Sequence, residues 1–434
     1  MNRKRNQITI RPQQPFAWLG LAALLFGGAL MASSVYGRGV WLFAAVFVAT
    51  LIGCVGDALV FDGEQLTRRG LKSLCGSLCF GRANTLALAD IETISTLVTN
   101  SRRNGALVYR TTITGAGQRW IITSRRSSYP HFIQALFSAV SPNALDPRSR
   151  DLLNYWPESE QLNLWQSATL SPALMTPPRM WRKLANHFAL AGQFDAAARY
   201  FRLAYRQDSR NAQLLYEIGR FLRLRVMLEQ VSPEEKNQRV KGRRRRIEMS
   251  PVRQSEACLR LAGRLASGDA ALLERIGETF FEMHQDHLAL RYFERALQVD
   301  AQRLRATIGL AEVALRSGQA ARVVYYYRAA ARVAETRGDL SLAGLAERQA
   351  AYYERLREDD RFLDAEMWRL DLLDQLKWAR RGALVAFLAS WLVHLTCVQF
   401  APAVQALSRE ISATSAIIWL TTITASYFFS QRRN

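Results

Sequence analysis

The chain has 434 residues, a formal net charge of +21 and a hydrophobic fraction of 49%. That fraction, with aromatic residues at 10%, excludes a disordered or low-complexity protein. Five cysteines in a chain of this length exclude a secreted scaffold stapled by disulfides. The length itself predicts about two or three domains.

Long uncharged runs near both ends of the chain predict four transmembrane helices, at residues 16–36, 40–56, 382–401 and 413–429. The flanking basic clusters would all lie on one side of the bilayer. We therefore expect a multi-pass protein of the bacterial inner membrane, with residues 57–381 and the basic tails 1–15 and 430–434 in the cytoplasm. A signal peptide is the alternative interpretation of the first run. His394, inside the third run, either has an intramembrane function or bonds a neighbouring helix as a neutral side chain.

The hydrophobic pattern of residues 57–140 is typical of β-strands. Short β-rich runs lie at 58–61, 85–88, 91–98, 106–114 and 119–123, and an amphipathic helix follows over 129–140. Asp62-Gly63 is a tight-turn dipeptide. The segments 61–66 and 88–91, together with the closing helix, resemble a bacterial pleckstrin-homology-like domain. This resemblance implies a small β-sandwich or open barrel that binds partners or lipid headgroups.

Two loops of this first region are basic, one with Arg68, Arg69 and Lys72 and the other with Arg102 and Arg103. Clustered cations of this kind bind anionic phosphates of lipids or nucleotides. The alternative is a cytoplasmic surface that follows the positive-inside rule without a dedicated ligand.

Beyond a proline-rich linker at 141–177, residues 178–381 show a repeating helical pattern. The small residue Ala185 is followed 34 positions later by Gly219, and Gly277 is followed at the same distance by Ala311. With large residues on either side, this spacing resembles tetratricopeptide repeats. A fifth, degenerate pair is expected at 340–356 and 362–378. The resemblance implies stacked antiparallel helix pairs whose concave face binds an extended peptide or a partner's helix.

The repeat resemblance also suggests which side chains face a partner. Some members of the family clamp a peptide carboxylate with basic and asparagine residues on successive first helices. Arg182, Asn186 and Arg275 occupy matching positions and are the predicted partner-binding residues, whereas Glu217 and Ala271 occupy two other such positions and do not fit.

The second repeat carries an insertion of about 24 residues, at 229–252, before the helix expected around 257–265. The insertion is expected to be a solvated loop, to lie on anionic lipid, or to bind an acidic partner. Nucleic acid is not expected, since no recognised nucleic-acid-binding fold accompanies the insertion. Its basic residues are Lys236, Arg239, Lys241, Arg243, Arg244, Arg245 and Arg246.

Catalytic motifs are not apparent in the sequence, which contains no phosphate-binding glycine loop and no nucleophile elbow. His284 and His287 have no third ligand at metal-binding spacing, and Cys75 and Cys79 have no further ligands, so packed thiols are predicted there in place of zinc. Residues 148–151 have the R-x-x-D form of some cyclic-dinucleotide sites, but the pattern is too short to indicate a ligand. No catalytic residue, metal or cofactor is therefore predicted.

The leading functional prediction is an adaptor, anchored in the inner membrane, that binds protein partners through its repeat groove. By analogy of architecture it would be a subunit of a cell-envelope assembly, such as an exopolysaccharide synthesis or secretion machine. The alternative is a membrane-tethered sensor of an anionic lipid or nucleotide, which would act through the basic loops.

Overall fold

A computed structural model of the chain describes residues 8–10, 58–70, 84–100, 107–125, 128–156, 163, 178–229 and 250–397, together with single positions between 404 and 429. The described residues form two compact units. The first contains residues 8–10, 58–68 and 84–351, and the second contains residues 69–70 and the described positions from 352 onward.

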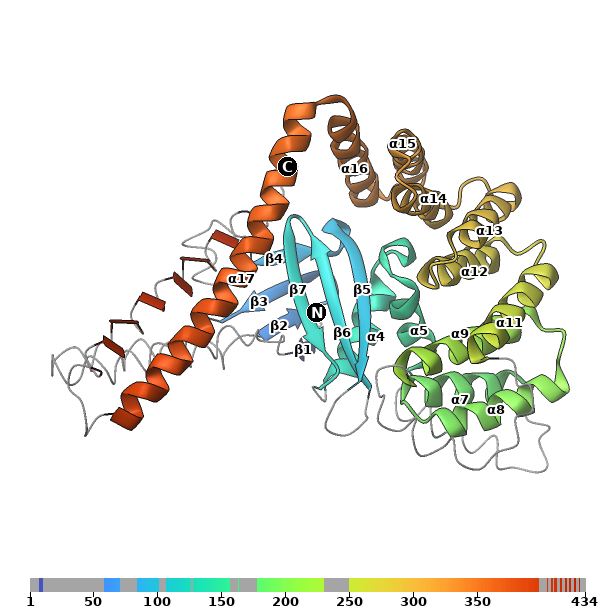
Figure 1. The fold of residues 1–434 in the computed structure, drawn as a ribbon. Helices are drawn as coiled ribbons and strands as arrows, with labels where there is room; N and C mark the ends of the chain where they lie inside the picture. Colours follow the sequence, from blue (N-terminus) through green and yellow to red (C-terminus); the bar gives the residue numbers. More distant parts are fainter. Residues whose placement is uncertain are drawn as a thin grey trace, which may run out of the picture. The chain divides into compact units, whose positions relative to one another are not determined.

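The described strands form two small antiparallel sheets (Figure 1). One sheet has the order β1 (Ile8–Ile10), β2 (Ala58–Phe61), β3 (Gln65–Arg69), β4 (Thr85–Ala87), and the other has the order β5 (Ile91–Asn100), β6 (Leu107–Gly115), β7 (Gln118–Thr123). A short 3-10 turn, Leu88–Asp90, separates β4 from β5. The strands predicted from the sequence are confirmed, to within a few residues at their ends. Two strands are additional: β1, in the stretch predicted to be a basic tail, and β3, which contains Arg68 and Arg69 that were predicted to lie in a loop.

The two sheets share one hydrophobic core with α4 (Tyr129–Ala139). Phe132, Ile133 and Leu136 of this helix are fully buried, as are Leu59 of β2 and Ile113 of β6. The period of the predicted helix placed the same apolar residues on one face, and the structure confirms that face as the buried one.

The predicted turn at Asp62-Gly63 also forms. The Asp62 carboxylate accepts hydrogen bonds from the backbone N–H groups of Glu64, at 3.0 Å, and Gln65, at 2.9 Å. Gly63 adopts a φ of 95°, a conformation that favours glycine because it has no Cβ. These local bonds set the register between β2 and β3.

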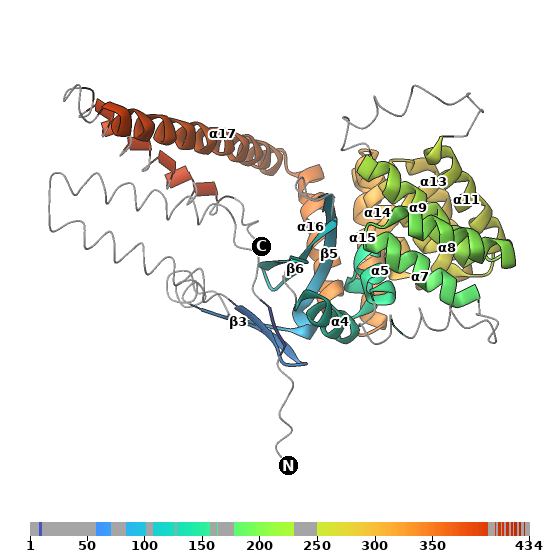
Figure 2. The ribbon, with the colours of Figure 1, turned by 90° about the horizontal axis from the view of Figure 1, so that it is seen from below.

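The rest of the first unit is an array of helices packed in consecutive pairs, in which α7 packs on α8, α9 on α11, α12 on α13 and α14 on α15 (Figures 1 and 2). α16 follows α15, and Leu342, Ala343 and Ala346 of α16 join a core with Ala330 and Ala334 of α15. The helices are α7 (Pro178–Leu190), α8 (Phe194–Gln207), α9 (Ala212–Glu229), α11 (Pro251–Leu265), α12 (Ala270–Glu282), α13 (Asp286–Val299), α14 (Leu304–Arg316), α15 (Ala320–Thr336) and α16 (Leu340–Glu358).

Small residues at the predicted spacing allow these helices to pack closely. Ala185 is fully buried, and a Cβ added to Gly219 would lie 2.8 Å from the side chain of Leu259. A Cβ on Gly277 would lie 2.8 Å from the ring of Phe293, in the next helix. The helix pairs and their small residues together confirm a tetratricopeptide-like repeat array.

The prediction of four transmembrane helices is wrong for the part of the chain that the structure describes. No described helix combines the length and the apolar character that a bilayer crossing requires. The third predicted run lies in α17 (Asp360–Cys397), where any segment of about 20 residues ending at Cys397 includes Arg380 and Arg381. The first two runs lie outside the described residues, and the fourth is described only at single positions.

This finding also overturns the predicted fold class and localisation. The described chain contains twelve α-helices and two small antiparallel sheets. The predicted fold class, a membrane protein with two transmembrane helices at each end, is therefore wrong for the described residues. The predicted multi-pass placement in a bacterial inner membrane is contradicted by the same finding. The predicted domain boundaries stay predictions.

Candidate functional site

The candidate site centres on α5 (Pro147–Tyr155), a helix in the segment predicted to be a proline-rich linker. It starts with Asp146 as N-cap, whose carboxylate accepts the N–H of Ser149 at 2.7 Å, and with Pro147 in the first turn. Proline suits this position because the first helical N–H groups have no partner in the helix. An aspartate cap followed by proline is a strong start signal for a helix.

One side of α5 forms hydrogen bonds with β5 and packs against the core of the sheets. The Asp146 carboxylate also accepts the N–H of Thr96 on β5, at 2.9 Å. The hydroxyl groups of Ser149 and Thr96 lie 2.7 Å apart, and Leu152 is buried in the core that α4 shares with the sheets. This side therefore belongs to the β-rich part of the unit.

The other side of α5 faces the repeat array. We call the side chains of α7, α9, α12 and α14 that line the contact with α5 the inner face. Arg150 donates to Glu278 at 2.6 Å and lies 3.5 Å from Glu274, both on α12. Arg305 of α14 also contacts Glu278, at 3.3 Å. Arg148 lies 3.8 Å from Glu282, at the end of α12.

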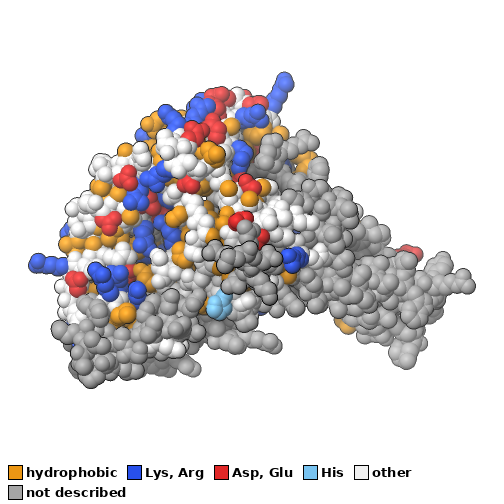
Figure 3. Space-filling model, turned by 180° about the vertical axis from the view of Figure 1, so that it is seen from behind, with side chains coloured by type: hydrophobic (Ala, Val, Ile, Leu, Met, Phe, Trp, Pro, Cys, Tyr) orange, Lys and Arg blue, Asp and Glu red, His pale blue; other side chains and the backbone are white. Residues whose placement is uncertain are grey.

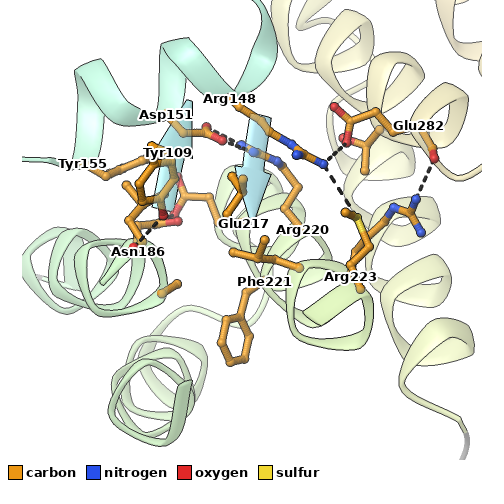
Figure 4. A pocket seen from close by; sticks show the side chains of 16 residues that line it. Tyr109, Arg148, Asp151, Tyr155, Asn186, Glu217, Arg220, Phe221, Arg223 and Glu282 are labelled. Carbon is orange, nitrogen blue, oxygen red and sulfur yellow. Dashed lines mark hydrogen bonds and ion pairs between the residues drawn. The ribbon is translucent and has the colours of Figure 1, made fainter. Parts of the chain in front are cut away.

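Asp151 makes the central ion pair of this contact (Figure 4). Its carboxylate accepts two hydrogen bonds from the guanidinium of Arg220 on α9 and lies 3.7 Å from Arg275 on α12. Both arginines lie against the ring of Tyr216, with 5.5 Å and 5.2 Å from guanidinium carbon to ring centroid. The aromatic ring and the carboxylate together hold the two cations in place.

Glu217 of α9 collects a second set of hydrogen bonds. It accepts from the Tyr155 hydroxyl at the end of α5, from Asn186 at 2.8 Å and from Gln213 at 2.8 Å, and the guanidinium of Arg182 lies 3.3 Å away. Glu217 is only 2% exposed. A buried carboxylate needs such partners, because removing it from water unpaired costs several kcal/mol.

Burial sets the protonation of these groups. Desolvation, and next the neighbouring charge of Glu217, raises the pKa of Tyr155, so this phenol stays protonated and donates its hydrogen bond. Desolvation, followed by repulsion from Glu278, raises the pKa of Glu274 above its ordinary 4.5. Desolvation and the nearby Arg275 lower the pKa of Arg220 to about 9, which leaves the guanidinium charged at neutral pH.

A small cavity of about 60 Å³ lies at the junction of α5 with α7, α9 and α12. Its volume suits a few water molecules and is well below that of a typical cofactor site. Figure 4 shows charged side chains of both signs pointing into this region. They include Arg148, Asp151, Glu217, Arg220, Arg223 and Glu282.

The three predicted partner-binding residues do lie on this inner face. Arg182 and Asn186 of α7 meet at Glu217, and Arg275 lies beside Asp151. The sequence analysis found that Glu217 does not fit a carboxylate clamp. In the structure, Glu217 accepts from Asn186 and lies beside Arg182, two of the three predicted residues. Their contacts are with residues of the same chain, and the predicted binding of a partner by them stays a prediction.

The predicted anion-binding residues are mostly outside the described residues, namely Lys72 and all seven basic residues of the insertion. Arg68 and Arg69 lie on strand β3, where Arg69 is exposed and the N–H of Arg68 donates to Asn84. On the face drawn in Figure 3, basic and acidic side chains are interspersed over the described surface. His394 lies in α17, but its side chain is outside the described set.

Comparisons with known proteins add little to this geometry. No protein-family model and no curated protein matches the chain. Among solved structures, one titled "Crystal structure of MamA" is 15% identical and covers 40% of this chain and 96% of its own, with a TM-score of 0.26. A second, titled "Crystal structure of MamA protein", is 14% identical and covers 42% and 94%, with a TM-score of 0.27. At these scores the likeness supports no conclusion about function.

Proposed function

We propose that the protein is a non-enzymatic interaction scaffold whose repeat array binds a helical segment of a partner protein on its inner face. One observation carries the proposal. The inner face already holds a helix, α5, through charged side chains that come from α9 and α12.

The chemistry of the inner face supports recognition. Its carboxylates and guanidinium groups are arranged in complementary pairs, such as Arg150 with Glu278 and Asp151 with Arg220. Such pairs contribute mainly to specificity, because a helix with the wrong charge at one position would leave a buried ion without a partner.

The predicted place in a cell-envelope assembly is a finer proposal that rests on analogy of architecture alone. The alternative, a sensor that binds anionic phosphates, depends on basic residues most of which lie outside the described residues. It stays a prediction.

Affinity purification of the tagged full-length protein, followed by mass spectrometry, tests the scaffold proposal. We compare the wild type with Arg275→Glu on the inner face and with Arg291→Glu, a matched change at an exposed position of α13. A partner that is retained by wild type and Arg291→Glu and lost from Arg275→Glu supports the proposal. Recovery of the same proteins with all three, or of none with the wild type, contradicts it.

A further inference from the structure

We infer that α5 is an internal ligand of the inner face, and that the partner is a helix with the same charge pattern, which takes its place. This inference rests on the proposed function and names the chemistry of the partner. The pattern is two arginines, an aspartate and a tyrosine on one side of a helix, with the spacing of 148, 150, 151 and 155.

The first support is that the β-rich part and the repeats have apolar cores, whereas the contact of α5 with the repeats is rich in charged groups. The β-rich part and the repeats have separate hydrophobic cores in the described chain. Leu190, at the end of α7, packs against the first of these cores. The contact of α5 with the repeats includes the ion pairs and hydrogen bonds described above, and the guanidinium of Arg148 also lies 3.6 Å from the sulfur of Met227. Polar contacts between parts with their own cores resemble transient protein–protein interfaces.

The second support is that this contact is incompletely packed and partly open to water. The cavity lies along it, and the side chains of Arg148, Arg182 and Arg220 are 19%, 24% and 21% exposed. Water at the edge of an ion-paired contact lowers the barrier to separating the charges, because each departing group is solvated as it leaves.

The third support comes from the energetics of buried ion pairs. The attraction within each pair is largely offset by the desolvation of both charges, so a docked pair adds little net stability. One unmatched charge, in contrast, is strongly unfavourable. The inner face therefore discriminates sharply between charge patterns, while an incoming helix that reproduces the pattern can replace the internal one at little net cost.

An internal ligand weakens the apparent affinity for an external one. If the inner face is open in only a small fraction of molecules, the apparent dissociation constant rises by the inverse of that fraction. Unseating α5 without changing the inner face should therefore strengthen binding of the external helix.

The probe is a fluorescent peptide of residues 141–158 that carries Ser149→Lys and Leu153→Asp, so that a lactam between these two side chains holds it helical. Ser149 and Leu153 lie toward the β-rich core, so the lactam leaves the charged side free. Fluorescence anisotropy measures its binding to full-length wild type, to Arg150→Glu and to the matched control Arg291→Glu. Arg150→Glu places a third carboxylate beside Glu274 and Glu278 and leaves the inner face itself unchanged.

We expect Arg150→Glu to bind the peptide at least about tenfold more tightly than wild type and Arg291→Glu do. A peptide with Arg150→Glu and Asp151→Arg should not bind. Equal or absent binding by wild type and Arg150→Glu, when the variant's circular dichroism and melting show that it is folded, overturns the inference.

A second measurement needs no variant. Saturating peptide should accelerate amide hydrogen exchange in residues 149–155 of the wild-type protein, because displaced α5 loses its contacts with the inner face. Unchanged exchange in α5 overturns the inference, whether or not the variant folds. The scaffold proposal would still stand if the purified partner depended on Arg275, so the two ideas can fail separately.

Discussion

At the scale of single residues, Glu217 shows why chemistry cannot be assigned from position alone. The family pattern suggested a residue there that would bind a carboxylate, and the sequence supplies a carboxylate. The structure gives it donors from three elements, Tyr155 on α5, Asn186 on α7 and Gln213 on α9. The sequence could place Asn186 and Glu217 on repeat helices, but it could not show that Tyr155, from a segment predicted to be a linker, would reach Glu217.

Removing this acceptor should be costly. We predict that Glu217→Ala lowers the free energy of unfolding by about 3–5 kcal/mol, because Arg182 would be left without its carboxylate partner in a largely buried place. Glu217→Gln should lose less, since it keeps the shape and one acceptor oxygen. Urea denaturation measures both. Glu294→Ala, at an exposed position of α13, is the control and should change stability by less than about 0.5 kcal/mol.

Glu274 should make stability depend on pH. Its raised pKa means that the folded state binds a proton more readily than the unfolded state, whose value is near 4.5. As the pH falls from neutral through the raised pKa, the wild type should therefore gain stability relative to Glu274→Gln. Glu278, Arg150, Arg303 and Arg305 are the charges that act on this carboxylate. Denaturation of both proteins between neutral pH and 4.5 tests this, and an opposite slope would contradict it.

At the scale of elements, the repeats were predictable and α5 was not. Small residues recurring at a fixed spacing identify helix pairs, and Gly277 and Ala311 lie where that spacing placed them. The prolines of residues 141–177 favoured a linker, yet Pro147 begins a helix capped by Asp146. That Asp-Pro pair was the available signal. It was obscured because the charged side of α5 shows no apolar stripe.

Close packing between adjacent repeats gives a further test. The ring of Phe293 lies against Gly277 of its own pair and Gly309 of the next, where an added Cβ would lie 2.5 Å from the ring. Although alanine favours a helix, we predict that Gly309→Ala lowers the free energy of unfolding by about 1–3 kcal/mol, because the ring must shift. Gly268→Ala has open space around its Cβ and should be nearly neutral in the same denaturation experiment. Equal effects of the two changes would argue against this packing.

At the scale of the whole molecule, local periodicity predicted most helices and strands but not how distant segments meet. Nothing in the sequence pairs residues 148–155 with residues 217–282, because these contacts depend on complementary charges rather than on a repeating pattern. The membrane prediction was wrong for the described residues. It placed Arg380 and Arg381 at the flank of an apolar run, whereas α17 carries both within any segment of about 20 residues that ends at Cys397.

The ion pair between Asp151 and Arg220 holds α5 on the inner face of the repeat array. A double-mutant cycle tests this central point most directly. Asp151→Ala, Arg220→Ala and the double variant are compared with the wild type by urea denaturation. We predict a coupling energy of about 1.5–3 kcal/mol, with the double variant less destabilised than the sum of the single variants. Additive effects of the two substitutions would show that the residues do not interact, and would contradict the placement of α5 on the inner face.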